Sequence, residues 1–279
     1  MRTTGENIEI RTGDITVRYN DLGEGSIPVI FIHGFPFDKT MWQPQTEALK
    51  NNNRVISYDI RGFGKTSAGK EKPSIQLFAD DLIKFMDVLQ IKKAIVCGLS
   101  MGGYILLNAV NRYPERFEGI ILCDTQCIAD SPEVKEKRKK TIAQIEKDGL
   151  SEYADNFVKT IFTEESINSN KTVVDKIKQT ILATAPVTIT QTLHALANRQ
   201  ESCFALTEIR IPTLIICGRQ DIVTPVSQSE YLYEHISHSE MHTIDKASHM
   251  SNLEQPEEFN KYVSAFAAML QPAILTPLA

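Results

Sequence analysis

The sequence lacks any long run of apolar residues. No stretch is long enough to span a bilayer, and the first twenty residues, MRTTGENIEIRTGDITVRYN, alternate in polarity and contain no apolar signal core. We therefore expect a cytoplasmic protein with no membrane partner, unless an export signal has been removed. An excess of positive charge is also absent, because 30 lysines and arginines are set against 35 aspartates and glutamates, for a net charge of −5. This balance argues against a broad surface for nucleic acid.

Cysteine is scarce and shows no pattern of pairs. An odd number without paired spacing does not indicate a disulfide framework. Cys97, Cys123 and Cys217 end apolar runs, which is typical of buried free thiols. The remaining two cysteines are Cys127 and Cys203.

Motifs that hold phosphates or metals are missing too. Neither G-x-G-x-x-G nor G-x-x-x-x-G-K-[ST] occurs, so a glycine-rich phosphate site is disfavoured. His235, His238 and His242 lie close together in the sequence, but no carboxylate or cysteine pattern supports a metal site, and we interpret them as surface residues. His194 is interpreted as structural, with contact to a substrate as the alternative. We predict neither a metal site nor an organic cofactor.

Continuous apolar runs recur along the chain. PVIFIHG, RVISYD, KAIVCG and GIILCD each predict a strand that is buried on both faces of a sheet. Before them, two alternating segments around Gly13 predict a hairpin. Between RVISYD and KAIVCG, residues 75–89 carry apolar side chains at helical spacing, with Ser74 as the expected N-cap. Strands that alternate with helices in this way indicate an α/β fold with a mainly parallel sheet.

The pattern changes between residues 126 and 206, where no β-like run occurs. The segment is charged and has helical spacing, and its lysine-rich stretch, 135–140, is typical of a solvated helix face. Strand patterns then return in IPTLIICG and EMHTID, and PEEFNKYVSAFAAML predicts a closing amphipathic helix. We therefore predict a core domain of residues 1–125 and 207–279, interrupted by a helical insertion of residues 126–206.

The segment GLSMG, residues 98–102, fits the pattern G-x-S-x-G and lies between a predicted strand and a predicted helix. This is the setting of a nucleophile elbow, a sharp turn that exposes a serine at the carboxyl end of the sheet. Small residues on either side of the serine avoid clashes between the strand and the helix. Ser100 is therefore the candidate nucleophile.

A serine hydroxyl needs a base, and the base needs an orienting carboxylate. The chain order expected after an elbow of this kind is serine, acid, histidine. Asp221 follows the strand run TLIIC and His249 follows the strand run EMHTI, so both are expected at the same edge of the sheet as Ser100. Asp124, at the end of GIILCD, is a rival acid that could also reach a histidine. We favour Asp221 because its loop lies where the acid usually lies in a fold with this type of nucleophile elbow.

Acyl transfer also needs hydrogen-bond donors for the tetrahedral oxyanion. One candidate is the backbone N–H of Met101, the residue after the nucleophile. The other is the N–H of Phe35, in the loop after VIFIHG, because the next residue, Pro36, has no N–H. His33 precedes a glycine in that loop, and we interpret it as shaping the loop rather than as taking a proton.

With these residues in place, the sequence resembles the α/β-hydrolase superfamily over nearly its full length. The matching segments, in order, are HGFPFDKTMW, YDIRGFGKTS, GLSMGGY, GRQDIVTP and ASHM. The first and third look most like small bacterial carboxylesterases and arylesterases, and they are also close to cofactor-free haloperoxidases and enol-lactonases. The resemblance implies the α/β-hydrolase fold, with the helical insertion as its cap. It also implies Ser100, Asp221 and His249 as a catalytic triad, and Phe35 and Met101 as oxyanion donors.

Particular residues narrow this resemblance. Haloalkane dehalogenases and epoxide hydrolases carry an aspartate where this chain has Ser100. Dehalogenation through an aspartate nucleophile is therefore disfavoured. The H-G-G-G oxyanion loop of another esterase group is absent. Asp59 and Arg61 match a structural segment of the superfamily, and we do not expect them to be catalytic.

We therefore expect a serine hydrolase that cleaves small to medium carboxylic esters through an acyl-enzyme. Its partner is then a small-molecule ester or lactone, and the sequence does not indicate an oligomeric state. Enol-lactone hydrolysis, perhydrolysis and carbon–carbon bond hydrolysis are alternatives on the same triad, and a ligand-binding receptor or regulator is an alternative on the same fold. The candidate walls of the substrate pocket, with burial in the core as the equal alternative for most of them, are Trp42, Phe157, Ile161 and Phe162.

Overall fold

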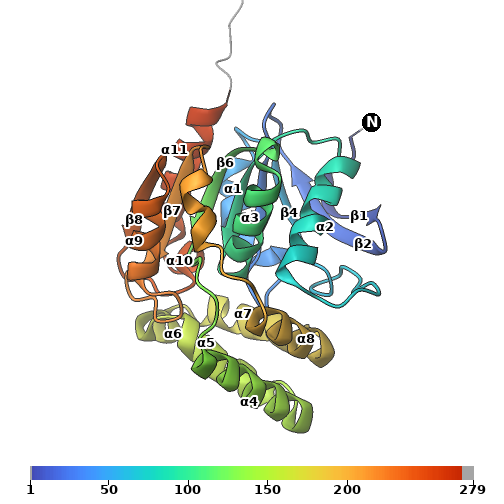
Figure 1. The fold of residues 1–279 in the computed structure, drawn as a ribbon, viewed down its shortest axis with the longest axis vertical. Helices are drawn as coiled ribbons and strands as arrows, with labels where there is room; N and C mark the ends of the chain where they lie inside the picture. The colour runs from blue at the N-terminus through green and yellow to red at the C-terminus, as the bar shows by residue number, and fades with distance from the viewer. Residues whose placement is uncertain (1, 272–279) are drawn as a thin grey trace, which may run out of the picture.

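The continuous apolar runs of the sequence lie side by side in the middle of one sheet in the computed structural model (Figure 1). The structure describes residues 2–271. Strands β3, β4, β5 and β7 are buried along their whole length, as expected for strands that are covered on both faces. The strands of the described residues are β1 (Gly5–Thr12), β2 (Ile15–Leu22), β3 (Val29–Ile32), β4 (Val55–Tyr58), β5 (Ala94–Leu99), β6 (Phe117–Cys123), β7 (Thr213–Gly218) and β8 (Ser239–Ile244).

The strand order is β1-β2-β4-β3-β5-β6-β7-β8. Strands β1 and β2 form the hairpin predicted around Gly13, and β2 pairs antiparallel with β4. From β4 to β8 every neighbouring pair is parallel. The carboxyl ends of parallel strands meet at one edge of a sheet, so the loops after β3, β5, β6, β7 and β8 come together there. The mainly parallel α/β fold predicted from the apolar runs is confirmed.

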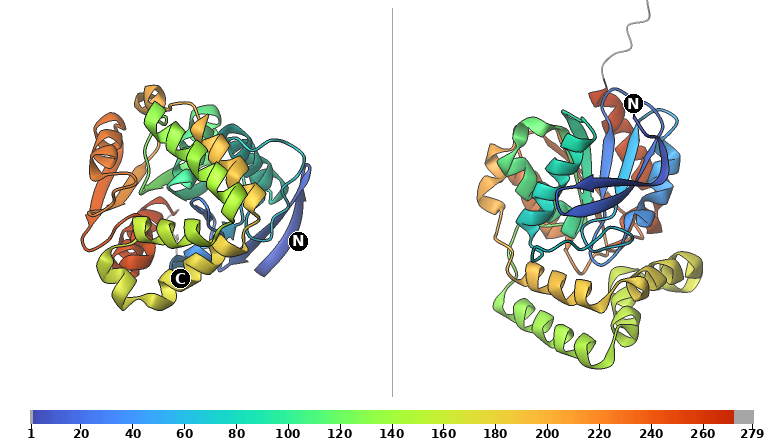
Figure 2. Two further views of the ribbon diagram at one scale, coloured as in Figure 1. Left: turned by 90° about the horizontal axis from the view of Figure 1, so that it is seen from below. Right: turned by 90° about the vertical axis from the view of Figure 1, so that its right-hand side faces the viewer.

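Helices cover both faces of this sheet (Figure 2, right). Helix α2 packs against α3, and α1 packs against α11. Ser74 caps α2 as predicted, because its hydroxyl accepts the N–H of Leu77 at 3.0 Å. No helix of residues 2–271 has the length and apolar character needed to cross a membrane. The core helices are α1 (Gln43–Leu49), α2 (Ile75–Val88), α3 (Met101–Arg112), α9 (Val226–His235), α10 (Ser251–Glu254) and α11 (Pro256–Leu270), with short 3-10 turns η1 (Lys39–Trp42), η2 (Pro114–Arg116) and η3 (Cys203–Glu208).

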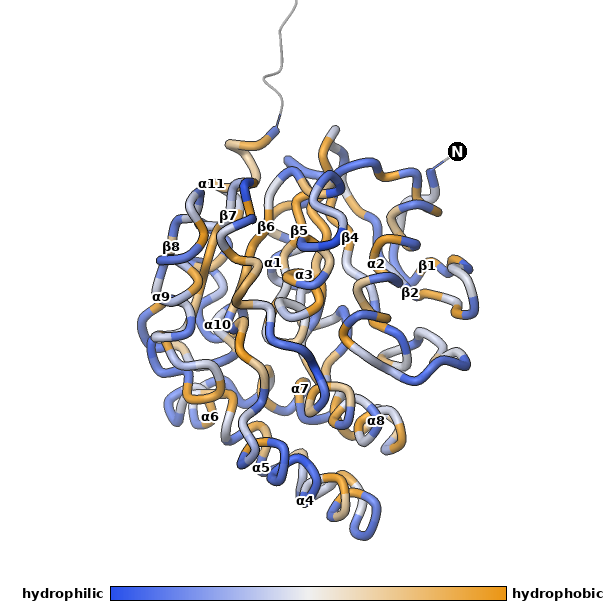
Figure 3. The backbone as a smooth tube through the Cα atoms, in the orientation of Figure 1, coloured by the Kyte–Doolittle hydropathy of each residue, from blue (hydrophilic) through white to orange (hydrophobic). Residues whose placement is uncertain are grey.

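The segment between β6 and β7 is helical. Its helices lie across the carboxyl edge of the sheet, where Figure 2 (left) shows them from below. Helix α4 is coloured hydrophilic over much of its length in Figure 3 and is largely exposed, in agreement with the solvated face predicted for residues 135–140. The helices are α4 (Pro132–Asp148), α5 (Ser151–Ile161), α6 (Glu164–Ser169), α7 (Lys171–Ala183) and α8 (Pro186–Ala197).

A disulfide joins the two ends of this helical insertion, which corrects the expectation drawn from the cysteine spacing. Cys127 and Cys203 are bonded although 76 residues separate them. The chain leaves β6 at the carboxyl edge of the sheet and, after the helical insertion, comes back beside the segment where it left, since the N–H of Ser202 donates to the carbonyl oxygen of Cys127 at 2.9 Å. That proximity is a property of the fold and leaves no signature in the sequence. Cys97, Cys123 and Cys217 are buried free thiols, as predicted.

We expect loss of this disulfide to lower the free energy of unfolding by about 4 kcal/mol, because a cross-link across a long loop restricts the unfolded chain. Denaturant unfolding of the wild type with and without a reducing agent measures this difference. The variant Cys127→Ser/Cys203→Ser is the matched control, since it should match the reduced wild type and not respond to the reducing agent. An identical unfolding midpoint for the oxidised and reduced wild type would contradict the prediction.

Candidate active site

Ser100 lies in a sharp turn between β5 and α3. Its backbone has φ 54° and ψ −114°, a conformation that residues other than glycine rarely adopt. The neighbouring glycines are needed for close packing. A Cβ on Gly98 would lie 2.4 Å from the carbonyl oxygen of Gly102, and one on Gly102 would lie 2.5 Å from the carbonyl oxygen of Ile32. The turn predicted from the G-x-S-x-G pattern is present, and its glycines are required because backbone segments meet there.

The turn is held in place by the next strand. The N–H of Ser100 donates to the carbonyl oxygen of Cys123 at 2.9 Å. The hydroxyl of Thr125 donates to the carbonyl oxygen of Ser100 at 2.8 Å. Because the end of β6 and the segment after it bond both sides of the residue, the strained conformation of Ser100 persists at the carboxyl edge of the sheet.

Asp221 and His249 meet at the same edge. Asp221 follows β7, His249 follows β8, and His249 Nδ1 is 2.8 Å from Asp221 Oδ2. The second oxygen of Asp221 accepts the N–H groups of Val223 and Thr224, and Oδ2 also accepts the hydroxyl of Thr224. These bonds fix the carboxylate, so the carboxylate can in turn fix the imidazole.

Mutual attraction shifts the pKa values of this pair in opposite directions. Burial by itself lowers the pKa of His249, but the charge of Asp221 and its hydrogen bond outweigh burial and raise that pKa above the usual value. Burial by itself raises the pKa of Asp221, but the charge and hydrogen bond of His249, together with the hydrogen bonds of Thr224, lower it below the usual value. The pair is therefore an ionised carboxylate that favours the protonated imidazole.

The rival acid, Asp124, has other partners. Its Oδ1 accepts the N–H of Gly218 at 2.8 Å, and its Oδ2 accepts the hydroxyl of Ser251. Burial and the negative charge of Asp221 raise the pKa of Asp124 well above the usual range. The structure thus brings His249 together with Asp221, while Asp124 connects the β7 loop to α10.

The loop after β3 carries Phe35. The N–H of Phe35 has no acceptor within residues 2–271, and the N–H of Met101 is at the first position of α3, where no intrahelical acceptor exists. His33 is fully buried, and its Nε2 accepts the N–H of Ile60 at 2.9 Å while Nδ1 lies 2.9 Å from the carbonyl oxygen of Gly34. One ring nitrogen thus bonds within the loop after β3 and the other bonds the segment after β4, so His33 ties these two segments together.

A buried ion pair supports the same loop. Lys39 Nζ lies 3.0 Å from Asp59 Oδ2, and Asp59 Oδ1 also accepts the backbone N–H of Lys39. Arg61 is buried too and pairs with Asp81 and Asp14. Asp59 and Arg61 are thus both held in ion pairs within the fold, and the sequence did not reveal their partners.

The candidate wall residues have different environments. Phe157 of α5 is half-buried, and its ring lies 6.4 Å from that of Phe35 and 6.2 Å from that of Phe37. Trp42 is fully buried, 4.8 Å from the ring of Phe31 and 6.1 Å from that of Phe259, which places it in the core. Ile161 and Phe162 are also buried. Phe157 is the one of the four with a ring contact to the loop that carries Phe35.

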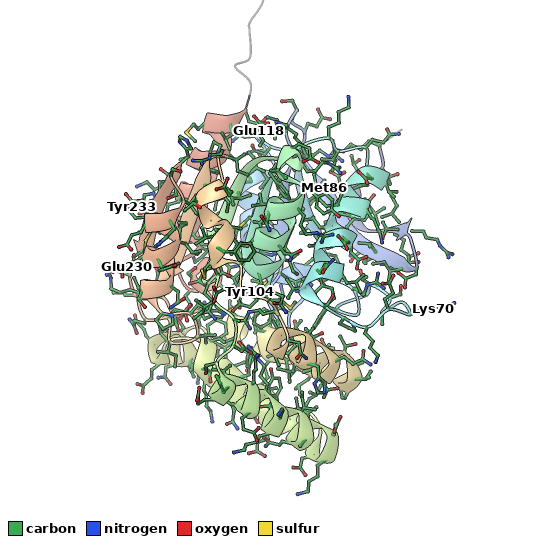
Figure 4. All side chains as sticks on the ribbon, viewed as in Figure 1. Lys70, Met86, Tyr104, Glu118, Glu230 and Tyr233 are labelled. Atoms are coloured by element: carbon green, nitrogen blue, oxygen red, sulfur yellow. A yellow bond between two sulfur atoms is a disulfide. The ribbon has the colours of Figure 1, made fainter. Side chains whose placement is uncertain are left out.

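Sequence reasoning missed a polar cluster where the insertion meets the core. Asp130 pairs with both Arg138 and Arg199, and the guanidinium of Arg199 lies 4.4 Å above the ring of Tyr104. Tyr104 is one turn after Ser100 and lies at the end of α3 that faces the insertion (Figure 4). Asp130 and Arg199 are 69 residues apart, so no local pattern marks them as partners.

A groove of about 800 Å³ lies beside this cluster. Its walls include Asn108 and Tyr104 of α3 and Gln191 and His194 of α8. Ser100, Asp221 and His249 do not line this groove. The described residues also contain no group of three histidine, cysteine, aspartate or glutamate side chains that could hold a metal.

Comparison with known proteins agrees with this architecture. The family described as alpha/beta hydrolase fold matches residues 27–256. The 3-oxoadipate enol-lactonase 2 of Acinetobacter baylyi is 32% identical over 253 residues, which cover 90% of this chain and 93% of that protein.

Solved structures give the same result. A thermophilic esterase from Thermogutta terrifontis has a TM-score of 0.91 at 31% identity, covering 96% of this chain and 100% of that one. The enol-lactonase from Burkholderia xenovorans LB400 has a TM-score of 0.88 at 27% identity, covering 94% and 100%. By both its sequence and its fold, the chain belongs to the α/β-hydrolase fold family.

Proposed function

We propose that this protein hydrolyses small to medium carboxylic esters with a triad of Ser100, His249 and Asp221. The observation that carries the proposal is the hydrogen bond between His249 and Asp221, formed at the same sheet edge as the strained turn of Ser100. Within residues 2–271 no hydrogen bond joins Ser100 Oγ to His249, so this contact is what the proposal adds. In enzymes of this kind it often tightens only when substrate is bound.

The reaction proceeds in two halves. Ser100 Oγ attacks the ester carbonyl carbon while His249 Nε2 takes its proton, and the N–H groups of Phe35 and Met101 hold the resulting oxyanion. Collapse breaks the ester bond, and His249 returns the proton to the departing alcohol. Water then attacks the acyl-enzyme with His249 as base, which releases the acid and restores Ser100. Asp221 keeps the proton of the neutral imidazole on Nδ1 and stabilises the imidazolium.

The helical insertion, residues 126–206, is proposed as a cap over the core of residues 1–125 and 207–279. Phe157 supports this role, because it projects from α5 to the rings of Phe35 and Phe37. An aromatic wall next to the proposed oxyanion donor favours an apolar acyl group of limited size.

A lactone is the second candidate substrate, favoured by the similarity to two enol-lactonases. The same attack by Ser100 would open the ring and leave the alcohol attached to the acyl chain. Hydrolysis of p-nitrophenyl esters from acetate to octanoate, compared with hydrolysis of small lactones, tests both candidates. The ester proposal expects kcat/KM to be highest for one of the esters, whereas a clear preference for a lactone would replace it.

We expect kcat/KM for the best ester to fall as the pH is lowered, with a midpoint above 6.5. The protonated imidazole cannot accept the Ser100 proton, and Asp221 raises the pKa of His249 above its usual value of 6.5. A pH–rate profile at constant ionic strength measures this midpoint. A midpoint clearly below 6.5 would mean that His249 is not the titrating base or that Asp221 does not act on it.

A further inference from the structure

Glu254 has three hydrogen-bond donors around a buried carboxylate. It ends the short helix α10, and 8% of its surface is exposed. Its Oε1 accepts the N–H and the hydroxyl of Thr163, each at 2.8 Å. Its Oε2 accepts the N–H of Ser248 at 2.7 Å. Glu254 therefore joins two segments that are far apart in the sequence.

The first of these segments belongs to the helical insertion. Thr163 is the N-cap of α6, and its hydroxyl accepts the N–H of Ser166 at 3.1 Å. It lies at the junction of α5 and α6, close in sequence to Phe157. The bond to Glu254 thus holds this part of the insertion against the core.

The second segment carries the catalytic histidine of the proposed triad. Ser248 precedes His249, and its hydroxyl donates to the carbonyl oxygen of Gln220 at 3.2 Å. The N–H of Gln220, which precedes Asp221, donates to the carbonyl oxygen of Ala247 at 2.9 Å. The loops of His249 and Asp221 are therefore bonded to each other, and Glu254 holds them from one side.

Both oxygens of Glu254 must accept hydrogen bonds. A carboxylate can do so, whereas the amide of glutamine accepts at one position only and donates at the other. Since both backbone partners are N–H donors, a glutamine at this position can satisfy the insertion or the histidine loop, but not both. Glu254→Gln is thus a nearly isosteric way to break one of the two connections.

We propose that Glu254 is a positioning residue, which holds the His249 loop in register with the helical insertion so that the imidazole stays aligned with Ser100. This role rests on the proposed ester hydrolysis. Small errors in the alignment of catalytic groups are costly, and a displacement of about 1 Å lowers the rate by up to about 100-fold. The connection also gives the insertion a direct mechanical link to the proposed base.

The test compares kcat and KM of three proteins on p-nitrophenyl acetate. We expect Glu254→Gln to lower kcat about tenfold with KM changed less than twofold, because the base is misaligned while the acyl pocket is intact. Glu257→Gln is the matched control: it removes the same charge from an exposed residue three positions away, and should behave as the wild type. A kcat for Glu254→Gln within twofold of the wild type, or a loss confined to KM, would overturn the proposal.

A double-mutant cycle with Thr163→Val separates alignment from general stability. Thr163→Val removes the hydroxyl donor and keeps the backbone N–H, so we expect it to lower kcat about threefold in the wild type and to have no further effect beside Glu254→Gln. Independent effects of the two substitutions on kcat would argue against the link. If Glu254→Gln does not fold, as judged by near-ultraviolet circular dichroism, Thr163→Val decides alone, and an unchanged kcat overturns the proposal.

Failure of the proposed function gives a different result. In that case the wild type itself has no turnover that depends on Ser100, and the role of Glu254 in hydrolysis falls with it. Ser100-dependent turnover with equal kcat for the wild type and Glu254→Gln overturns the role of Glu254 alone.

Discussion

Ser100→Ala should abolish ester hydrolysis, with kcat reduced by a factor on the order of 10⁵. Alanine removes the attacking oxygen, and without it no acyl-enzyme forms. The oxyanion donors and the pocket are retained, so a weak water-driven reaction is what remains. The methyl side chain fits the strained turn as well as serine does, so the fold should be unchanged. Steady-state rates on the best p-nitrophenyl ester measure the loss.

A matched serine for the control substitution lies at the opposite edge of the sheet. Ser237 is exposed and precedes β8, at the edge away from the carboxyl ends of the parallel strands. Ser237→Ala should keep the wild-type rate. If Ser100→Ala turns over esters within tenfold of the wild type while its thermal unfolding is normal, a serine nucleophile at this position is ruled out.

Asp221→Asn should lower kcat about 10⁴-fold while the protein stays folded. The amide can still contact the imidazole, but it can donate to Nδ1, which stabilises the tautomer with its proton on Nε2. That tautomer cannot accept the Ser100 proton. The charge that raises the pKa of His249 is also lost, so any residual activity should have its acid limb at lower pH.

Asp124→Asn is the informative comparison, because Asp124 was the rival acid and lies close enough to influence the pair. Burial and the charge of Asp221 already oppose ionisation of Asp124, so an amide replaces a group whose charged form is disfavoured. We expect a loss of less than about tenfold in kcat, together with some loss of stability at the contacts to Gly218 and Ser251. The reverse ranking, with Asp124→Asn the more damaging, would assign the acid to Asp124.

The features that the sequence predicted well are those set by local rules. The buried strands follow from continuous apolar runs, and the closing helix, Pro256–Leu270, coincides with the amphipathic segment. The cap of α2 follows from Ser74, and the strained turn follows from the glycines around Ser100. Each of these depends on residues within about one turn or one strand of each other.

The features that were missed join residues far apart in the chain. The cysteine spacing indicated no disulfide framework, yet Cys127 and Cys203 are bonded, because the two ends of the helical insertion lie side by side in the fold. Glu254 is five positions after His249 and carries no motif, because its partner Thr163 is 91 residues away. Trp42 was a candidate pocket wall with burial in the core as the equal alternative, and its packing against Phe31 of β3 and Phe259 of α11 favours the core.

The sequence by itself therefore determined the order of strands and helices, the turn at Ser100, and the short set of acids and histidines that follow strands. Periodicity, capping and backbone sterics act over a few residues, and a single sequence records them directly. Only the tertiary structure decided that His249 bonds Asp221 rather than Asp124, that a disulfide closes the helical insertion, and that Glu254 connects this insertion to the histidine loop. Hydrogen bonds and cross-links depend on distances of a few ångströms between loops, and those distances exist only after the strands have paired.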